Sequence, residues 1–259
     1  ALLFLAFTPQ FSRPYTIVLL CSIFTYIALT LSWTLFSGPT GYISLATAAF
    51  FGIGIYVAVF LAPIAPLPVV FIAGGLMSLI TAFLVGIITL RLRGIFFAVF
   101  TFGIVEFLKH VVLWIAVNVF QTRGHVVPRV DNVTAYYVLL ITIVVLLLTI
   151  FYLKRSRYGK ALATISSSEE AAAHIGINVV ALKVSVFSLS AFFVGLTGAV
   201  AACRWGYTDP YISFDAFYSF LPVLMAIFGG MGSLFGPVIG ATVFSYLQEV
   251  LITSFPYYY

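Results

Sequence analysis

Charged residues are scarce in this sequence. Asp, Glu, Lys and Arg together make up 7% of the 259 residues, whereas an ordinary soluble domain carries about 25%. Hydrophobic residues account for 63%, and the mean hydropathy is +1.19. This composition excludes a soluble domain and indicates an integral membrane protein in contact with lipid. The net charge of +5 is small and scattered, which argues against a nucleic-acid partner.

Motifs for catalysis and metal binding are also missing. The sequence has no Gly-Lys-Ser/Thr phosphate loop, no His-Glu-x-x-His and no Gly-x-Ser-x-Gly. Its two cysteines, Cys21 and Cys203, lie in apolar stretches without metal-ligand spacing, so we interpret them as buried thiols. We therefore expect no enzyme activity, no metal site and no cofactor bound by this chain. Any energy from nucleotide hydrolysis must come from a partner.

Long hydrophobic runs dominate what is present. Because a spanning helix needs about 20 apolar residues, the sequence predicts an all-α transmembrane helix bundle that forms one domain over residues 1–259. Hydropathy predicts eight spans, at residues 15–36, 42–62, 67–90, 95–119, 135–153, 184–205, 217–231 and 236–254. The last two could instead form a re-entrant pair. Residues 1–8 would be the remnant of another span, and we expect both ends to be cut within neighbouring spans.

One long polar segment, residues 154–183, interrupts these spans. Placing it in the cytoplasm follows the positive-inside rule. Seven basic residues then lie inside: Arg91, Arg93, Lys154, Arg155, Arg157, Lys160 and Lys183. Four lie outside: Arg13, Arg123, Arg129 and Arg204. The sequence therefore predicts a multi-pass plasma-membrane protein with this loop in the cytoplasm.

Glycines concentrate in two clusters, residues 37–54 and 229–240. Glycine and proline inside a span free backbone groups that protein or a water-filled path must satisfy, and paired broken helices are typical of transporters. Five residues of the first cluster are candidates for a substrate path: Gly38, Gly41, Ser44, Thr47 and Gly52. The alternative is close helix packing. The spacings of Gly232, Gly236 and Gly240, and of Gly195 and Gly198, favour it for those residues.

Ionisable residues inside a span form a second candidate site. Lys109 and His110 follow Glu106 at three and four residues, so both can reach its carboxylate on one helical face. A charge inside the bilayer is costly and usually faces the bundle interior. The cluster is either the proton relay of a secondary transporter or a neutralised pair packed against neighbouring helices.

The polar segment contains signals for one short helix, from Ser168 to Ile175. Ser166 and Ser167 each precede a glutamate by three residues, which fits a capping box, and Glu169 and Glu170 complement the positive end of the helix dipole. Gly176 fits a left-handed helix terminator. Because so short a helix is unstable alone in water, it must pack either on a partner or on its own spans.

At this point the motifs resemble a known family. Glu170-Ala171-Ala172, three residues and then Gly176 resemble the loop by which ABC importer permeases contact their ATPases. Gly176-Ile177-Asn178 is typical of branched-chain amino acid permeases, and three further motifs are similar to theirs: residues 41–54, 91–98 and 229–237. Ala46-Thr47 departs from the family's usual Gly-His, and the Asn often found in the preceding span is absent near Ser32-Trp33.

The resemblance implies a permease subunit of a prokaryotic ABC importer. Its partners would be ATPase subunits, an identical or different sister permease and a soluble binding protein outside the membrane. The solute would be a small polar or amphipathic molecule, most simply a branched-chain amino acid, or urea, an amide or a sugar as in related permeases. Coupling to the ATPases is expected at Glu169, Glu170, Ala171, Ala172 and Gly176. A proton-coupled secondary transporter and a scaffold or passive channel are the other classes.

Overall fold

The computed structural model describes residues 13–122 and 124–254, which fold almost entirely as helices. Eight helices build the bundle: α2 (Pro14–Thr40), α3 (Thr47–Leu61), α4 (Leu67–Thr89), α5 (Ile95–Asn118), α6 (Asn132–Arg155), α9 (Val179–Trp205), α11 (Phe217–Gly229) and α12 (Gly236–Ser254). Three shorter helices connect them: α7 (Arg157–Ser167), α8 (Glu169–His174) and α10 (Pro210–Ser213). The two-residue strands β1 (His125–Val126) and β2 (Tyr207–Thr208) pair antiparallel. The prediction of an all-α bundle is confirmed.

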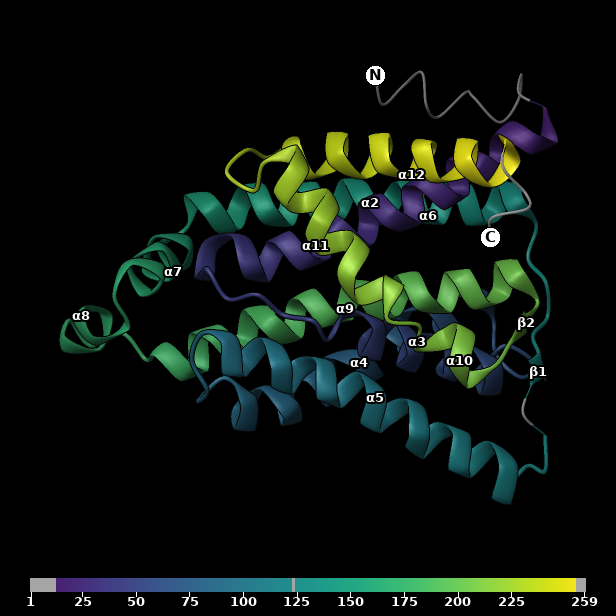
Figure 1. Cartoon of the computed structure of the whole chain (residues 1–259), viewed down its shortest axis with the longest axis horizontal. Helices are drawn as coiled ribbons and strands as arrows, with labels where there is room; N and C mark the ends of the chain where they lie inside the picture. Colours follow the sequence, from purple (N-terminus) through teal and green to yellow (C-terminus); the bar gives the residue numbers. More distant parts are fainter. Residues whose placement is uncertain (1–12, 123, 255–259) are drawn as a thin grey trace.

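The polar elements lie at opposite ends of the bundle (Figure 1). Helices α7 and α8 project at one end, and the β1–β2 pair closes the other. The first of these is the end predicted to be cytoplasmic. Of the basic residues predicted at the other end, Arg123 lies outside the described residues. The core runs through the middle, where α9 packs along α2, α3 and α4. Both cysteines are free and buried, as predicted.

Glycines allow α9 to approach α3 and α4 closely. A side chain at Gly54 of α3 would overlap the backbone of Gly195 on α9, and one at Gly198 would overlap the backbone of Phe51. Transmembrane helices associate through such small-residue contacts because lipid offers no hydrophobic driving force between them. Gly236 and Gly240 of α12 similarly approach α11 at Gly229. Gly232, which the four-residue spacing grouped with them, instead lies in the turn between these helices.

Six segments of the described chain are long and apolar enough to cross a membrane. They are α2, α4, α5, α6, α9 and the run Pro210–Gly229 that joins α10 to α11. The two other predicted spans, α3 and α12, are also helices of the bundle, but α3 has only 15 residues. The predicted remnant span at residues 1–8 lies outside the described residues.

Three predicted boundaries are wrong. The second span does not begin at residue 42, because residues 41–46 are not helical and α3 starts at Thr47. Helix α2 continues through Gly38 and Pro39 to Thr40, beyond the predicted end at residue 36. Helix α9 starts at Val179, where the Asn178 side chain accepts a hydrogen bond from the Ala181 N–H and caps it. Lys183 therefore lies within this helix and not in the loop.

Candidate functional site

The predicted short helix exists as α8, one residue shorter at each end. The Ser168 hydroxyl caps it by accepting a hydrogen bond from the Ala171 N–H at 3.3 Å. Gly176 follows with φ +84, a left-handed conformation that side chains with a branched Cβ avoid. Ala172 is fully buried, whereas Ala171 and Ile175 are exposed. One face of α8 thus packs on its own chain, and the other is open for a partner.

The predicted capping boxes are wrong. Ser166 and Ser167 lie inside a second helix, α7, which the sequence analysis missed. The Ser167 hydroxyl donates to the Ala163 carbonyl one turn back, at 3.2 Å, a local bond that serine makes readily within a helix. Ser156 begins α7 by accepting a hydrogen bond from the Gly159 N–H at 3.2 Å. The segment is therefore two capped helices that meet at Ser168, instead of one.

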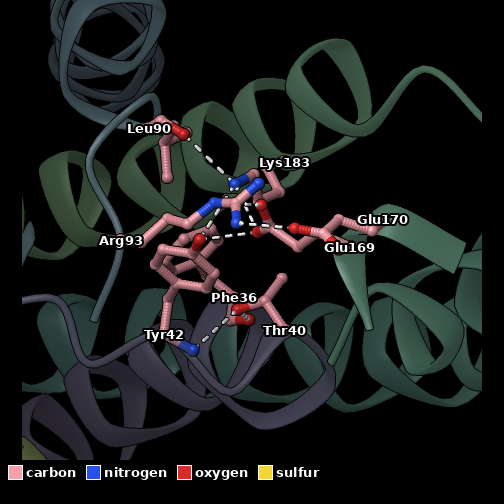
Figure 2. Close-up of polar contacts among 8 residues, drawn as sticks. All are labelled: Phe36, Thr40, Tyr42, Leu90, Arg93, Glu169, Glu170 and Lys183. Carbon is pink, nitrogen blue, oxygen red and sulfur yellow. Dashed lines mark hydrogen bonds and ion pairs between the residues drawn. The ribbon is translucent and has the colours of Figure 1, made fainter. Parts of the chain in front are cut away.

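A buried lysine joins α8 to the rest of the bundle. Lys183 is 1% exposed, and its Nζ donates to Glu169 Oε1 at 2.7 Å, to the Leu90 carbonyl at 3.1 Å and to the Tyr42 hydroxyl at 3.2 Å. The same ammonium lies 4.4 Å from the centre of the Tyr42 ring. Figure 2 shows these groups converging from different segments. A lysine this deeply buried stays charged only when its hydrogen bonds and countercharge are supplied.

Glu169 is the acceptor at the centre of this network. Its Oε1 also accepts a hydrogen bond from the Tyr42 hydroxyl at 2.5 Å, and its Oε2 pairs with Arg93 Nε at 3.3 Å. Partial burial alone would raise the pKa of Glu169, but the hydrogen bonds from Lys183 and Tyr42 and the charge of Arg93 outweigh it and lower that pKa. The carboxylate is therefore ionised at neutral pH.

The network connects three segments that are far apart in the sequence. Lys183 and Glu169 belong to the start of α9 and to α8, Leu90 and Arg93 to the turn between α4 and α5, and Tyr42 to the extended residues 41–46. We call these four charged or hydroxyl-bearing side chains, Tyr42, Arg93, Glu169 and Lys183, the latch. Two of the motifs that resemble permeases each contribute one latch residue, Tyr42 and Arg93, and Glu169 directly precedes the loop motif that begins at Glu170. The fold therefore brings separate motifs to one place.

Sequence reasoning did not find the latch. Lys183 was counted only as a basic residue that sets the orientation. Arg93 was counted as such a residue and as part of the motif at residues 91–98, and Tyr42 as part of a glycine-rich motif. Glu169 was predicted as a coupling residue, but no contact among the four was predicted. One signal was available, because Lys183 is followed by a long apolar helix without another charge until Arg204. Glu170 behaves differently from Glu169: its side chain is 78% exposed and pairs with Arg93 at 3.6 Å. A surface pair of this kind contributes little to stability.

A cavity of about 550 Å³ lies beside the latch. Its walls come from the end of α2, residues 41–43, the start of α5 and the junction of α7 with α8. Tyr42, Arg93 and Glu169 line it together.

The extended residues 41–46 expose backbone groups inside the bundle, and side chains from three helices satisfy them. Trp33 Nε1 donates to the Ser44 carbonyl at 2.8 Å, the Leu45 N–H donates to Thr101 Oγ1 at 3.0 Å, and the Ser219 hydroxyl donates to the Leu45 carbonyl at 2.6 Å. Irregular backbone at membrane depth needs such partners. These three partners were also missed from the sequence.

The predicted path residues lie on or beside this extended segment. Gly41 ends α2 with φ +73, Ser44 is buried in the extended segment, and Thr47 begins α3. Gly38 and Gly52 lie within helices instead. A side chain at Gly38 would contact Thr34 of its own helix, and one at Gly52 would overlap the ring of Phe214. The structure thus brings Gly41, Ser44 and Thr47 together and places Gly38 and Gly52 against packed neighbours.

The polar cluster within α5 is an ion pair with a separate histidine. Lys109 Nζ lies 2.6 Å from Glu106 Oε2. His110 Nδ1 lies 2.8 Å from the Glu106 carbonyl oxygen, a backbone atom, and not from its carboxylate. The expected contact of His110 with the carboxylate is absent in this geometry. The ion pair agrees with a neutralised cluster, although 37% of the Glu106 side chain is exposed.

Comparison with known proteins gives one family for nearly the whole chain. Residues 15–258 match the family model described as branched-chain amino acid transport system, permease component. The chain is similar to the high-affinity branched-chain amino acid transport permease LivM of Salmonella typhimurium and to LivM of Escherichia coli, at 26% identity over 87% of this chain and 61% of each relative. It is also similar to the fructose import permease FrcC of Rhizobium meliloti, at 24% identity over 44% of this chain and 33% of that protein.

These matches are partial for the relatives. The chain spans about three fifths of the length of the LivM proteins, 61% in each case. No solved structure matches this chain significantly. The family is thus carried by the sequence match, and the geometry above is a property of this chain.

Proposed function

The chain belongs to the family of branched-chain amino acid transport system permease components, and from that premise we propose that it is the membrane-spanning subunit of an ABC importer. Its six candidate spans agree with a multi-pass inner-membrane protein. The proposed solute is a branched-chain amino acid, as named for the LivM relatives. The relatives are transport subunits and not enzymes, so the proposed ATP hydrolysis takes place in a partner chain.

The latch is the observation that carries this proposal. It connects α8, which presents an exposed apolar face at the predicted cytoplasmic end, to the extended segment that carries Gly41, Ser44 and Thr47. A short helix fixed at one point by a buried ion pair moves as a unit, because breaking that pair would leave a buried charge uncompensated. Movement of α8 is therefore transmitted to the proposed substrate path.

The exposed face of α8 is the proposed docking surface for an ATPase subunit. Ala171, Ala173 and Ile175 are exposed there, and small and aliphatic side chains suit insertion of a helix into a groove on a partner. Ala172 and Glu169 face the permease itself and act as positioning residues. Under this proposal, Ala171 and Glu170 would contact the partner among the predicted coupling residues, and Gly176 sets where the helix ends.

The proposed mechanism is alternating access driven by the partner ATPases. ATP-dependent closure of two ATPases would displace α8 on each permease of a pair, and the latch would pass that displacement to residues 41–46. An extended segment held by side-chain hydrogen bonds can exchange partners without unfolding a helix, which gives the path two discrete states. A soluble binding protein would deliver the solute on the opposite side.

Substitution of Gly176 by valine tests the coupling. Gly176 has φ +84 and open space around it, so Gly176→Val strains the end of α8 without a steric clash. We expect solute-stimulated ATP hydrolysis and uptake to fall together, by about tenfold, in vesicles that contain the assembled importer. Gly103→Val is the matched control, because a Cβ at Gly103 also meets no described atom within 4 Å and its φ is not positive. Equal activity of both variants would remove α8 from the coupling route.

The solute itself is tested by uptake of leucine, urea and fructose with and without ATP. Uptake of leucine that depends on ATP supports the proposal, whereas preference for fructose would align the chain with its sugar-permease relatives. Uptake driven by a proton gradient without ATP, and abolished by Glu106→Gln, would favour the secondary transporter instead.

A further inference from the structure

A polar cavity lies at the end of the bundle opposite the latch, between α2, α9, α11 and α12. Its volume is about 200 Å³, room for about six waters at about 30 Å³ each or for the charged groups of one small solute. Its lining includes Ser22, Tyr26, Arg204, Tyr218, Ser245 and Glu249. Arg204 belongs to the last turn of α9, at the end predicted to face outward. No step of the proposed coupling mechanism uses this cavity.

Opposite charges line the cavity without pairing with each other. Arg204 Nη2 donates to the Ser22 hydroxyl at 2.8 Å, and Glu249 Oε1 accepts from the Tyr15 hydroxyl at 3.0 Å. Within residues 13–122 and 124–254, Arg204 has no carboxylate within ion-pair distance. A fixed cation and a fixed anion held apart in one cavity are complementary to a zwitterion that can contact both.

A buried hydroxyl in the same cavity also lacks a partner. Ser245 is 6% exposed, and its Oγ has no hydrogen-bond partner in the described part of the chain. A buried polar atom without a partner is rare in native proteins and calls for an explanation such as a bound ligand or water. Because Ser245 lines the cavity with Arg204 and Glu249, a polar ligand there would satisfy it.

An apolar cavity adjoins the polar one. It has a volume of about 460 Å³, and the two cavities share Tyr26, Tyr218 and Gln248 in their walls. The rings of Tyr26 and Tyr218 stack with centroids 6.4 Å apart. One further wall residue is charged, Asp215, whose Oδ1 accepts a hydrogen bond from the Phe217 N–H. The remaining walls are aliphatic or aromatic, including Leu221, Met225 and Phe244. An apolar space next to a pair of opposite charges matches an amphipathic zwitterion better than a purely polar solute.

We propose that the two cavities form an outward-facing entry site for an amino acid with an aliphatic side chain. The Arg204 guanidinium binds the carboxylate, the Glu249 carboxylate binds the ammonium group, the Ser245 hydroxyl donates to the ligand carboxylate, and the side chain lies in the cavity beside Tyr26 and Tyr218. This inference deepens the proposed function, because it places that function's solute at defined residues. It is independent of the latch and of the partner ATPases.

Equilibrium binding of labelled leucine to the full chain in lipid nanodiscs, without ATPase, tests the site. We expect saturable binding, with Arg204→Gln and Glu249→Gln each weakening it by about tenfold or more, as expected for loss of a charge-assisted hydrogen bond. Leucinamide lacks the carboxylate, so Arg204→Gln should leave its binding nearly unchanged. 4-Methylpentanoate lacks the ammonium group, so Glu249→Gln should leave its binding nearly unchanged. Arg13→Gln, which removes an exposed arginine outside the cavity, should bind leucine normally.

Several results would overturn the site. The first is that the wild type does not bind leucine at millimolar concentration. The second is that Arg204→Gln and Arg13→Gln bind leucine equally well. The third is that Arg204→Gln weakens the binding of leucinamide as much as the binding of leucine. Retention of phosphatidylethanolamine by the wild type but not by Arg204→Gln, detected by native mass spectrometry without leucine competition, would make the cavity a lipid site. ATP-driven uptake of leucine despite any of these results would keep the proposed function and reject only the entry site. Leucine binding with the expected effects of the variants, but without ATP-driven uptake, would keep the entry site and reject the proposed function.

Discussion

Lys183→Met removes the charge of the latch while keeping a long unbranched side chain in the same space. The wild-type ammonium is 1% exposed and donates three hydrogen bonds, to Glu169, Leu90 and Tyr42. Removing one partner of a buried ion pair costs about 3–5 kcal/mol. Glu169 is 16% exposed and keeps Arg93 at 3.3 Å, so we expect a smaller loss of unfolding free energy, about 2–3 kcal/mol.

The double variant separates the charge from the packing. In Lys183→Met with Glu169→Gln, no unpaired carboxylate remains, so the double variant should be more stable than Lys183→Met alone by about 1 kcal/mol or more. Energy-coupled uptake should stay low in both, since the connection from α8 to Tyr42 is weakened either way. The double variant is thus expected to recover stability without recovering energy-coupled uptake.

The two buried cysteines supply the assay. Cys21 and Cys203 are the only cysteines in the sequence and are fully buried, so a maleimide dye labels the chain only as it unfolds. Labelling during a titration with denaturing detergent, with the wild type and both variants in parallel, reports the loss of structure. A charged latch would be refuted if Lys183→Met unfolded at the same detergent concentration as the wild type. It would also be refuted if the single and double variants unfolded at the same concentration.

Three further predictions concern pH and packing. The pKa of Glu169 is lowered from its usual 4.5, so its ionised form stabilises the fold above that pH and this contribution is lost as the pH falls below it. Maleimide needs the thiolate, so this prediction is followed by helical circular dichroism in denaturing detergent, in which the wild type should lose stability more steeply at acid pH than Glu169→Gln. Ser219→Ala leaves the Leu45 carbonyl of the extended segment and the Ala48 N–H of α3 without their side-chain partner and should cost about 2 kcal/mol. Ser185→Ala removes an exposed hydroxyl bonded within its own helix and should cost almost nothing. Gly54→Ala forces α3 away from α9 and should lower the unfolding free energy by about 1–3 kcal/mol in the cysteine-labelling assay, whereas Gly103→Ala should change it little. Equal losses for Ser219→Ala and Ser185→Ala, or for Gly54→Ala and Gly103→Ala, would contradict the stated contacts.

The sequence alone determined the class of the protein and most of its helices. Scarce charge and long apolar runs leave only a membrane helix bundle, because backbone groups in lipid must be satisfied within helices. Local signals also located α8 within one residue at each end, since a capping serine, two glutamates and a glycine act over a few residues. The approximate positions of all eight bundle helices followed from hydropathy.

Other features depended on the tertiary structure. Local signals did not reveal α7. Ser166, Ser167 and Ser168 are each able to cap a helix, and only the fold makes Ser168 the cap of α8 and places the other two inside α7. Hydropathy extended the second span through residues 42–46, since apolar residues in an extended segment look like a helix until side chains of other helices hydrogen-bond its backbone. The four-residue spacing of the glycines did not show that Gly232 lies in a turn while Gly229 packs against Gly236 and Gly240 of α12.

The latch and the paired cavities belong entirely to the tertiary structure. The sequence singles out Glu169 as a coupling residue but does not connect it to Tyr42, Arg93 or Lys183, and the role of the four comes from meeting around one buried ammonium group. Arg204 and Glu249 are likewise two ordinary charges near helix ends until the packing of α9 against α2 and of α2 against α12 places them in one cavity. Their roles depend on distances between residues far apart in the chain, which a sequence pattern does not encode.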